Sequence, residues 1–350
     1  MSLAINLIMI IFVFGVCITI HEFGHFITAK KSGIGVIEFS IGMGPLLWHT
    51  DKNGTQYSLR ALPIGGYCAM VGEDEASDEP DAFGNAPLLR RIIVVVAGVF
   101  MNFVLALIMS VVFVCLVGYT PNEISFVSEN SAAEEAGILA GDRVERFDGS
   151  RVYNFKEITV SMQFYKGDGP IELTLNRNGE RIKLSVTPKK LETGAYQLGI
   201  AGKGQKTSNP LTVVGYAAVE VRYWIKTTIQ SLYQLITGGV SIKQLSGPVG
   251  ISATMNTVIE EAKETGNNLN VVVNLINFCI LLSANLGVMN LLPIPALDGG
   301  RLFFLLIELI FKKKLSDEVE GKINQAGMAF LYGLMALVLV MDVSRLVFKK

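Results

Sequence analysis

Two histidines and a glutamate stand at metal-hydrolase spacing near the start of the chain, in His21-Glu22-Phe23-Gly24-His25. Residues at positions i and i+4 of a helix share one face, so His21 and His25 can each offer a ring nitrogen to one metal ion. Glu22 then lies beside the open coordination position, where a general base acts on water. The chain has three histidines, so an abundance of histidine does not explain the pair. The motif predicts a hydrolytic metal site, and an ordinary charged surface helix is the alternative.

A hydrolytic zinc site needs three protein ligands and one open position, so a third ligand must come from elsewhere in the chain. The strongest candidate is Asp298, which follows an uncharged run over residues 265–297. Pro293 and Pro295 would interrupt a helix there and free the chain to turn the carboxylate inward. Taken alone, Asp298 is better explained as the cap of the helix that follows. Imidazole and carboxylate ligands around an open position favour Zn²⁺, and other divalent metals remain alternatives.

The composition indicates a membrane protein. Half of the 350 residues are hydrophobic and 17% are charged, and the mean hydropathy of +0.44 is higher than a soluble domain of this size needs. A helix needs about 20 apolar residues to cross a bilayer. Four stretches meet this requirement: 1–20, 92–119, about 271–292 and the shorter 325–341. The four cysteines do not suggest a disulfide scaffold. The net charge of −1, without a long basic patch, gives no indication of a nucleic-acid partner.

Lysines and arginines beside the spans predict the orientation of the chain. The first six residues contain none, whereas residues 30–91 contain six, and three consecutive lysines at 312–314 precede the fourth span. Positive loops remain in the cytosol, so the N-terminus and residues 121–266 should lie outside. The first and third spans then run in the same direction, and both ligand sets lie at their cytosolic ends. Ionisable groups at this depth are costly unless they face a polar cavity, so the topology favours one joint metal site.

Two segments between the spans have patterns of their own. Residues 36–70 are β-like, with an Asn53-Gly54 turn signal inside a possible hairpin. Residues 122–202 indicate a compact α+β domain. Its signals are a capping box of Ser131 with Glu134, a second helix that begins at Asn154, and a hairpin turn at Asn178-Gly179.

Residues 209–245 are apolar but interrupted by Glu220, Arg222 and Lys226, which predicts a helix along the membrane surface rather than a crossing.

We therefore expect eight segments. They are a first transmembrane helix with the histidine motif (1–30), a cytosolic or membrane-associated β-hairpin loop (31–91), a second transmembrane helix (92–119), an α+β domain (120–203), an amphipathic interfacial segment (204–264), a third transmembrane segment with the Leu-Asp-Gly motif (265–311), a cytosolic loop (312–324), and a fourth transmembrane helix with a tail (325–350).

Four segments resemble those of the site-2 protease family of intramembrane metalloproteases, specifically its bacterial RseP-like branch with a PDZ domain. They are the histidine motif at 21–25, Gly98-Val-Phe-Met-Asn102, Ser246-Gly247-Pro248-Val249-Gly250, and the segment from Asn290 to Gly299. The resemblance covers almost the full chain. The two ligand motifs are its specific part, and the glycine-containing motifs are weaker.

The resemblance implies zinc ligands at His21, His25 and Asp298 and a general base at Glu22. It also implies that Asn102 and Asn290 lie near the active site and help to place the substrate, with a polar contact between helices as the alternative. The α+β domain would be a circularly permuted PDZ fold, single rather than tandem, which either binds a newly made C-terminus or obstructs bulky substrates. The β element would accept an extended substrate segment as an added strand, with a plain cytosolic hairpin as the alternative.

We therefore expect a polytopic α-helical membrane protein of the cell (inner or plasma) membrane, with about four transmembrane helices, a membrane-associated β element and one extracytoplasmic α+β PDZ-like domain. The expected activity is zinc-dependent hydrolysis of peptide bonds in transmembrane segments of single-pass membrane proteins, near the cytosolic side. By resemblance, the substrates include anti-sigma factors already cut by another protease and signal-peptide remnants. The alternatives are a membrane-anchored metalloprotease for soluble or misfolded proteins and a noncatalytic PDZ adaptor, which the presence of Glu22 disfavours.

Overall fold

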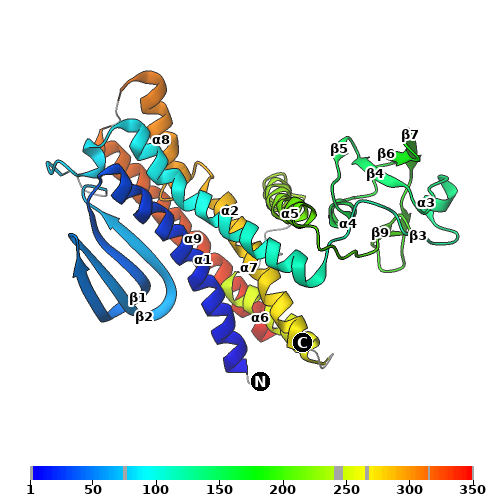
Figure 1. Ribbon diagram of the computed structural model, residues 1–350, viewed down its shortest axis with the longest axis horizontal. Coiled ribbons are helices and arrows are strands. Elements are labelled where there is room, and N and C mark those ends of the chain that lie inside the picture. Colours follow the sequence, from blue (N-terminus) through cyan, green and yellow to red (C-terminus); the bar gives the residue numbers. More distant parts are fainter. Residues whose placement is uncertain (1–2, 74–76, 240–246, 265–267, 314–315, 349–350) are drawn as a thin grey trace. The chain divides into compact units, whose positions relative to one another are not determined.

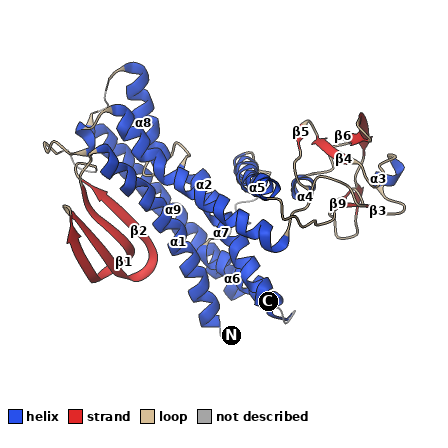
Figure 2. Ribbon diagram, viewed as in Figure 1, coloured by secondary structure: helices blue, strands red, loops and turns tan. Residues whose placement is uncertain are grey.

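The computed structural model describes the chain except residues 1–2, 74–76, 240–246, 265–267, 314–315 and 349–350. Ser246, which belongs to one of the motifs above, therefore lies outside the described residues. The chain divides into two compact units. One is mainly helical and combines residues 1–109 with 228–350, and the other spans residues 110–227. Figure 2 shows long helices and one large hairpin in the first unit, and small sheets with short helices in the second.

In the part of the chain that the structure describes, four helices are long and apolar enough to cross a membrane, as the sequence predicts. They are α1 (Leu3–Ser32), α2 (Leu88–Val117), α7 (Asn268–Asn290) and α9 (Asp317–Phe348). Helix α1 packs against α7, and the two run in the same direction, while the part of α2 in this unit runs opposite to them (Figure 1). This arrangement brings the C-terminal end of α7, at Asn290, to the part of α1 that contains His21.

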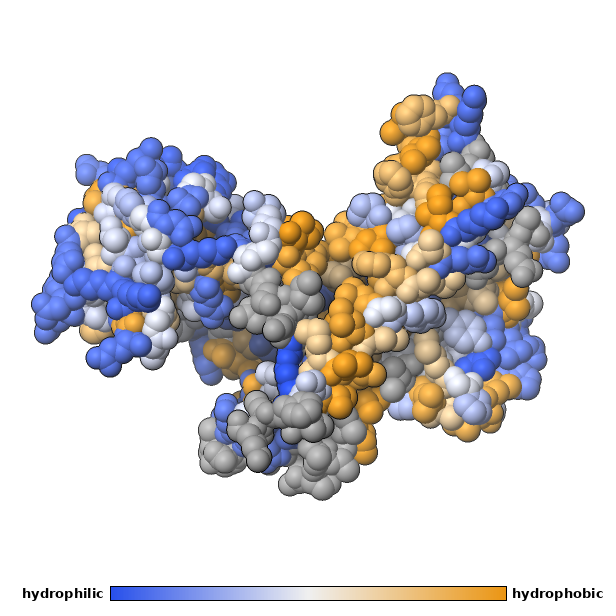
Figure 3. Space-filling model, turned by 180° about the vertical axis from the view of Figure 1, so that it is seen from behind, coloured by the Kyte–Doolittle hydropathy of each residue, from blue (hydrophilic) through white to orange (hydrophobic). Residues whose placement is uncertain are grey.

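Apolar side chains cover much of the surface of the helical unit, whereas the second unit is largely hydrophilic on the face that Figure 3 shows. Helix α9 illustrates the difference, because large side chains such as Phe330 and Val340 are 63% and 66% exposed. A soluble protein rarely leaves a contiguous apolar surface of this extent without a partner. Lipid is the surrounding medium that such a surface fits.

Strands β1 (Val36–Lys52) and β2 (Thr55–Met70) form the predicted hairpin around the Asn53-Gly54 turn. Residues 36–41 of β1 pair with residues 66–70 of β2 on one side and with residues 56–59 on the other, so the two long strands fold back on each other. The short helix η1 (Phe83–Asn85) follows. Two aromatic residues, the partly buried Phe26 of α1 and the buried Phe39 of the hairpin, pack with ring centroids 4.9 Å apart and fix the sheet to α1.

The segment after α7 breaks at the two prolines and restarts as α8 (Asp298–Phe311). The N-cap of α8 is Leu297, which makes no side-chain capping bond, and Asp298 is the first helical residue. The carboxylate of Asp298 therefore does not cap α8, which was the alternative role for this residue. A buried, bidentate ion pair between Arg91 of α2 and Glu308 holds the later turns of α8 in place, with Nη2 and Oε1 2.6 Å apart.

The second unit contains the predicted α+β elements. Ser131 accepts a hydrogen bond from the Glu134 N–H, and Asn154 accepts one from the Glu157 N–H, so both predicted helix caps are confirmed. The carboxylate of Glu134 accepts from the N–H of Asn130 rather than from that of Ser131, one residue earlier than a capping box requires. The elements are β3 (Phe126–Val127), α3 (Ala132–Glu135), β4 (Arg143–Phe147), β5 (Ser150–Arg151), α4 (Phe155–Gln163), β6 (Ile171–Arg177), β7 (Glu180–Val186), β8 (Lys189–Lys190), β9 (Tyr196–Gln197) and β10 (Ile200–Ala201).

A four-stranded sheet in the order β5-β4-β6-β7 forms the centre of this unit, and the Asn178-Gly179 turn joins β6 to β7 as predicted. Its apolar core includes Leu173 and Leu175, which are 1% and 0% exposed. Asp142 directly precedes β4 and pairs with Arg177 of β6 at 2.7 Å. The hydrogen bonds from Arg177 hold the pKa of Asp142 below its ordinary value.

The expected interfacial segment forms two helices, α5 (Pro210–Ile236) and α6 (Pro248–Glu264), neither of which is among the candidate spans in the described part of the chain. Helix α5 exposes apolar side chains at helical spacing, with Ile229, Tyr233 and Ile236 at 54%, 64% and 83%. Helix α6 instead buries Ile259 against Ile10 of α1. The two helices therefore present different faces, and α5 has the pattern expected of a helix at a membrane surface.

Candidate metal centre

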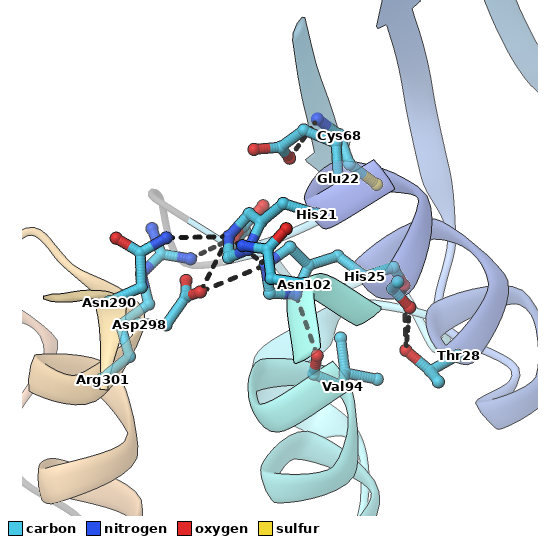
Figure 4. A network of polar contacts seen from close by, with 12 residues as sticks. His21, Glu22, His25, Thr28, Cys68, Val94, Asn102, Asn290, Asp298 and Arg301 are labelled. Atoms are coloured by element: carbon cyan, nitrogen blue, oxygen red, sulfur yellow. Dashed lines mark hydrogen bonds and ion pairs between the residues drawn. The ribbon is translucent and has the colours of Figure 1, made fainter. Parts of the chain in front are cut away.

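The histidine motif lies within α1, inside the candidate membrane span Ile8–Ser32. His21 and His25 occupy successive turns and are 5% and 7% exposed. Their Nε2 atoms lie 3.2 Å apart, so both rings direct the same nitrogen to one point. Figure 4 shows this convergence, with Asp298 facing the two rings.

The third predicted ligand meets the two histidines. Oδ2 of Asp298 lies 3.0 Å from Nε2 of His21 and 3.3 Å from Nε2 of His25. Ligand atoms at about 2.0–2.1 Å from a tetrahedral zinc ion are about 3.3 Å apart, so these separations match a shared zinc site. Oδ2 is buried and makes no hydrogen bond to another protein group in the described part of the chain, as expected of an atom reserved for a metal. The donor set of this structure therefore fits zinc.

Backbone and amide groups of α2 orient the two rings. Nδ1 of His25 lies 2.9 Å from the carbonyl oxygen of Val94, so its N–H donates there and Nε2 keeps a lone pair for the metal. Nδ1 of His21 lies 3.0 Å from the side-chain amide of Asn102. When the Asn102 amide is oriented with its Oδ1 towards His21, Oδ1 accepts the Nδ1–H of that ring. Nε2 of His21 then keeps a lone pair for the metal, as Nε2 of His25 does. This orientation also gives a partner to Oδ1 of Asn102, which is buried without one.

Glu22 is anchored by the hairpin. Its Oε2 accepts a hydrogen bond from the N–H of Cys68 in β2 at 3.1 Å. The contact fixes one of the two carboxylate oxygens of Glu22. Sequence patterns do not identify this contact, because the donor is a backbone group whose side chain has no part in it.

The two asparagines implied by the resemblance both reach His21. Asn102 has no exposed surface, and its contact with Nδ1 supports a role in orienting the ring. Nδ2 of Asn290 lies 3.2 Å from Nε2 of His21, on the side where the ligand atoms converge. Asn290 is therefore the better placed of the two for contact with a substrate. Asn102 lies on α2 and His21 on α1, so the first contact joins two helices as well as a predicted ligand.

Glycine 98 allows α2 to approach the histidines. A Cβ built at Gly98 would lie 2.2 Å from Nε2 of His25 and 2.8 Å from Cε1 of His21. We expect Gly98→Ala to displace both rings, to weaken zinc binding by about 10–100-fold and to reduce cleavage by about 100-fold. Bound zinc and the rate of cleavage by the purified variant check this expectation.

Gly333→Ala in α9 is the matched control, because a Cβ there meets no atom within 4 Å. It should keep the zinc content and rate of the wild type. Full zinc content and full activity in Gly98→Ala would contradict the close packing described here.

Comparison with known proteins agrees with this site. The model of peptidase family M50 matches residues 9–334. A protein of Clostridium acetobutylicum named as a zinc metalloprotease is 40% identical over 344 residues, with 97% of each chain covered. The protein of Bacillus subtilis named regulator of sigma-W protease RasP is 30% identical, with 97% of this chain and 99% of that protein covered. Zinc metalloprotease RasP of Shouchella clausii is 31% identical, with 97% and 99% covered.

Among solved structures, the PDZ domain of an SdrC-like protein of Listeria innocua aligns with 24% of this chain and 96% of that domain, at 16% identity and a TM-score of 0.22. The family match spans most of the chain and includes both ligand motifs. The relatives cover nearly its full length. The chain therefore belongs to peptidase family M50, and it is a zinc metalloprotease of the membrane.

Proposed function

We propose that the chain hydrolyses peptide bonds within or beside transmembrane segments of other membrane proteins. His21, His25 and Asp298 hold the zinc ion, and Glu22 is the general base. The observation that carries this proposal is the convergence of the three ligand atoms, 3.0–3.3 Å apart, from a candidate membrane span and a helix almost three hundred residues later. A protease that acts on soluble chains has no need to bury its ligands in such a span.

Zinc bound by this donor set supplies Lewis-acid chemistry, since it activates water and polarises the scissile carbonyl. Oε1 of Glu22 accepts the proton of the attacking water and returns it to the nitrogen of the leaving amine. The N–H of Cys68 keeps the carboxylate in one orientation during both transfers. Asn290 is placed to hydrogen bond the substrate near His21.

A transmembrane substrate arrives as a helix, and its carbonyls must become accessible before water can attack. Residues 66–70 of β2 can pair with the unwound segment of such a substrate. In the part of the chain that the structure describes, this segment pairs with a strand on one side only. The N–H of Cys68 points away from that partner to Glu22. We propose that the substrate extends along this edge as an added strand and pairs with the backbone groups that the Cys68–Glu22 and Met70–Glu73 hydrogen bonds leave open. This pairing replaces the hydrogen bonds of its unwound helix.

We propose single-pass membrane proteins as the substrates, including regulators of a sigma factor that another protease has first shortened, as the name of the Bacillus subtilis relative suggests. Signal-peptide remnants, which are also single apolar segments in the membrane, are proposed as substrates for the same reason. The loop charges favour an extracytoplasmic N-terminus and second unit, with the metal centre near the cytosolic side. The second unit, as a PDZ-like domain, would bind the new C-terminus or restrict access by bulky substrates.

Reconstitution in lipid vesicles tests the proposed function. The purified protein should cut a single-pass membrane peptide within its apolar segment, and mass spectrometry should locate the cut. We expect unfolded casein to be cut at least about 10-fold more slowly, because it does not deliver a segment at the depth of the ligands. A zinc chelator should stop both reactions. Preference for casein would favour a membrane-anchored protease for soluble proteins instead.

A further inference from the structure

An ion pair close to the metal centre joins two segments that each hold one part of it. Glu73 follows the end of β2 and pairs with Arg301 in the first turn of α8. Both are mostly buried, with 16% and 25% of their side-chain surfaces exposed. Oε2 of Glu73 also accepts a hydrogen bond from the N–H of Met70 at 3.2 Å. Glu73 is thus attached to the last residue of β2 and to α8 at the same time.

The two segments carry different catalytic groups. Strand β2 provides the Cys68 N–H that holds Glu22, two residues before Met70. Helix α8 begins with Asp298, and Arg301 lies three residues later on the same face of the helix (Figure 4). The ion pair therefore fixes the position of β2, whose Cys68 N–H holds Glu22, relative to α8, which carries Asp298. A displacement of about 1 Å between such groups can reduce the rate about 100-fold.

We propose that Glu73 and Arg301 are positioning residues for hydrolysis. They fix the strand that holds Glu22 against the turn that carries Asp298, without contacting the substrate or the metal themselves. The planar fork of the guanidinium suits this task, because it restrains the orientation of its partner as well as the distance. This inference rests on the roles proposed above for Glu22 and Asp298.

The test uses the full-length protein in vesicles with the single-pass membrane peptide as substrate. We expect Glu73→Gln and Arg301→Gln each to lower kcat by about 10–100-fold while KM changes by less than about threefold. Bound zinc should remain at the wild-type level. The double variant should lose less than the product of the two single losses, because each single variant already removes the contact between Glu73 and Arg301.

Glu308→Gln is the matched control, since Glu308 forms another mostly buried ion pair of α8, with Arg91. We expect it to lower the thermal stability of the protein and to leave kcat within about twofold of the wild type. Its side chain starts ten residues after Asp298, about 15 Å along the helix.

Three results would overturn the inference. They are single variants with unchanged kcat, additive losses in the double variant, and an equal loss of kcat in Glu308→Gln, which would point to general destabilisation of α8. A wild-type protein that binds zinc but cuts no membrane peptide would instead overturn the proposed function, and this inference with it. An active wild type with an equally active Arg301→Gln variant would overturn the inference alone.

Discussion

Glu22→Gln is expected to abolish cleavage while zinc and fold are kept. The amide oxygen of glutamine can still accept the hydrogen bond that the N–H of Cys68 gives to Glu22 at 3.1 Å. The three ligands are untouched, so zinc content should stay at about one ion per chain. What disappears is the basic oxygen, because a neutral amide takes no proton from water. Loss of general-base catalysis predicts a fall in kcat of about 1,000-fold or more.

The measurement is the cleavage rate of the membrane peptide in vesicles, alongside bound zinc and the thermal unfolding temperature. Glu192→Gln in the second unit provides the control, since this side chain is exposed and should tolerate the same change. Residual cleavage above about a tenth of the wild-type rate, in protein that holds zinc, would remove Glu22 from the role of base. If the variant loses zinc together with activity, Glu22 has a structural role instead.

Side-chain chemistry allowed the sequence to predict the proposed ligand set. His21 and His25 stand four residues apart on an apolar helix, and Asp298 ends an uncharged run. Each pattern involves only residues that are close together in the sequence. Only the charges of the loops suggest that the histidines and the aspartate meet. The hairpin around Asn53-Gly54 and the caps at Ser131 and Asn154 were predictable for the same reason, because each depends on neighbours in sequence.

The parts that support the ligands were not predictable in this way. The carbonyl of Val94 and the N–H of Cys68 act through backbone groups, which every residue possesses. The partners Glu73 and Arg301 are 228 positions apart, and nothing local in the sequence distinguishes them from the other charged residues. Gly98 appears in a motif, but only the three-dimensional structure shows that two imidazole rings occupy the place of its missing side chain. Sequence thus indicates the reactive groups, whereas the fold identifies what holds them.

Asp298→Asn distinguishes a metal ligand from a helix cap, the two interpretations that the sequence leaves open for this residue. Asparagine caps helices about as well as aspartate, so a capping role predicts little change. A ligand role predicts a large change, because the neutral amide replaces an anionic oxygen that lies 3.0 Å and 3.3 Å from the two histidine nitrogens. We expect zinc affinity to fall by about 100-fold or more and cleavage to fall with it.

Zinc affinity is measured by competition with a chromogenic chelator, and cleavage in vesicles as above. The control is Asp148→Asn, because Asp148 is exposed and its positive φ of 46° is a conformation that asparagine adopts readily. Addition of excess zinc should partly restore cleavage by Asp298→Asn, since two ligands remain, and should not affect Glu22→Gln. These opposite responses separate the residue that holds the metal from the residue that moves the proton. A variant with asparagine at 298 that keeps its zinc and its rate would show that the two histidines bind the ion without this carboxylate.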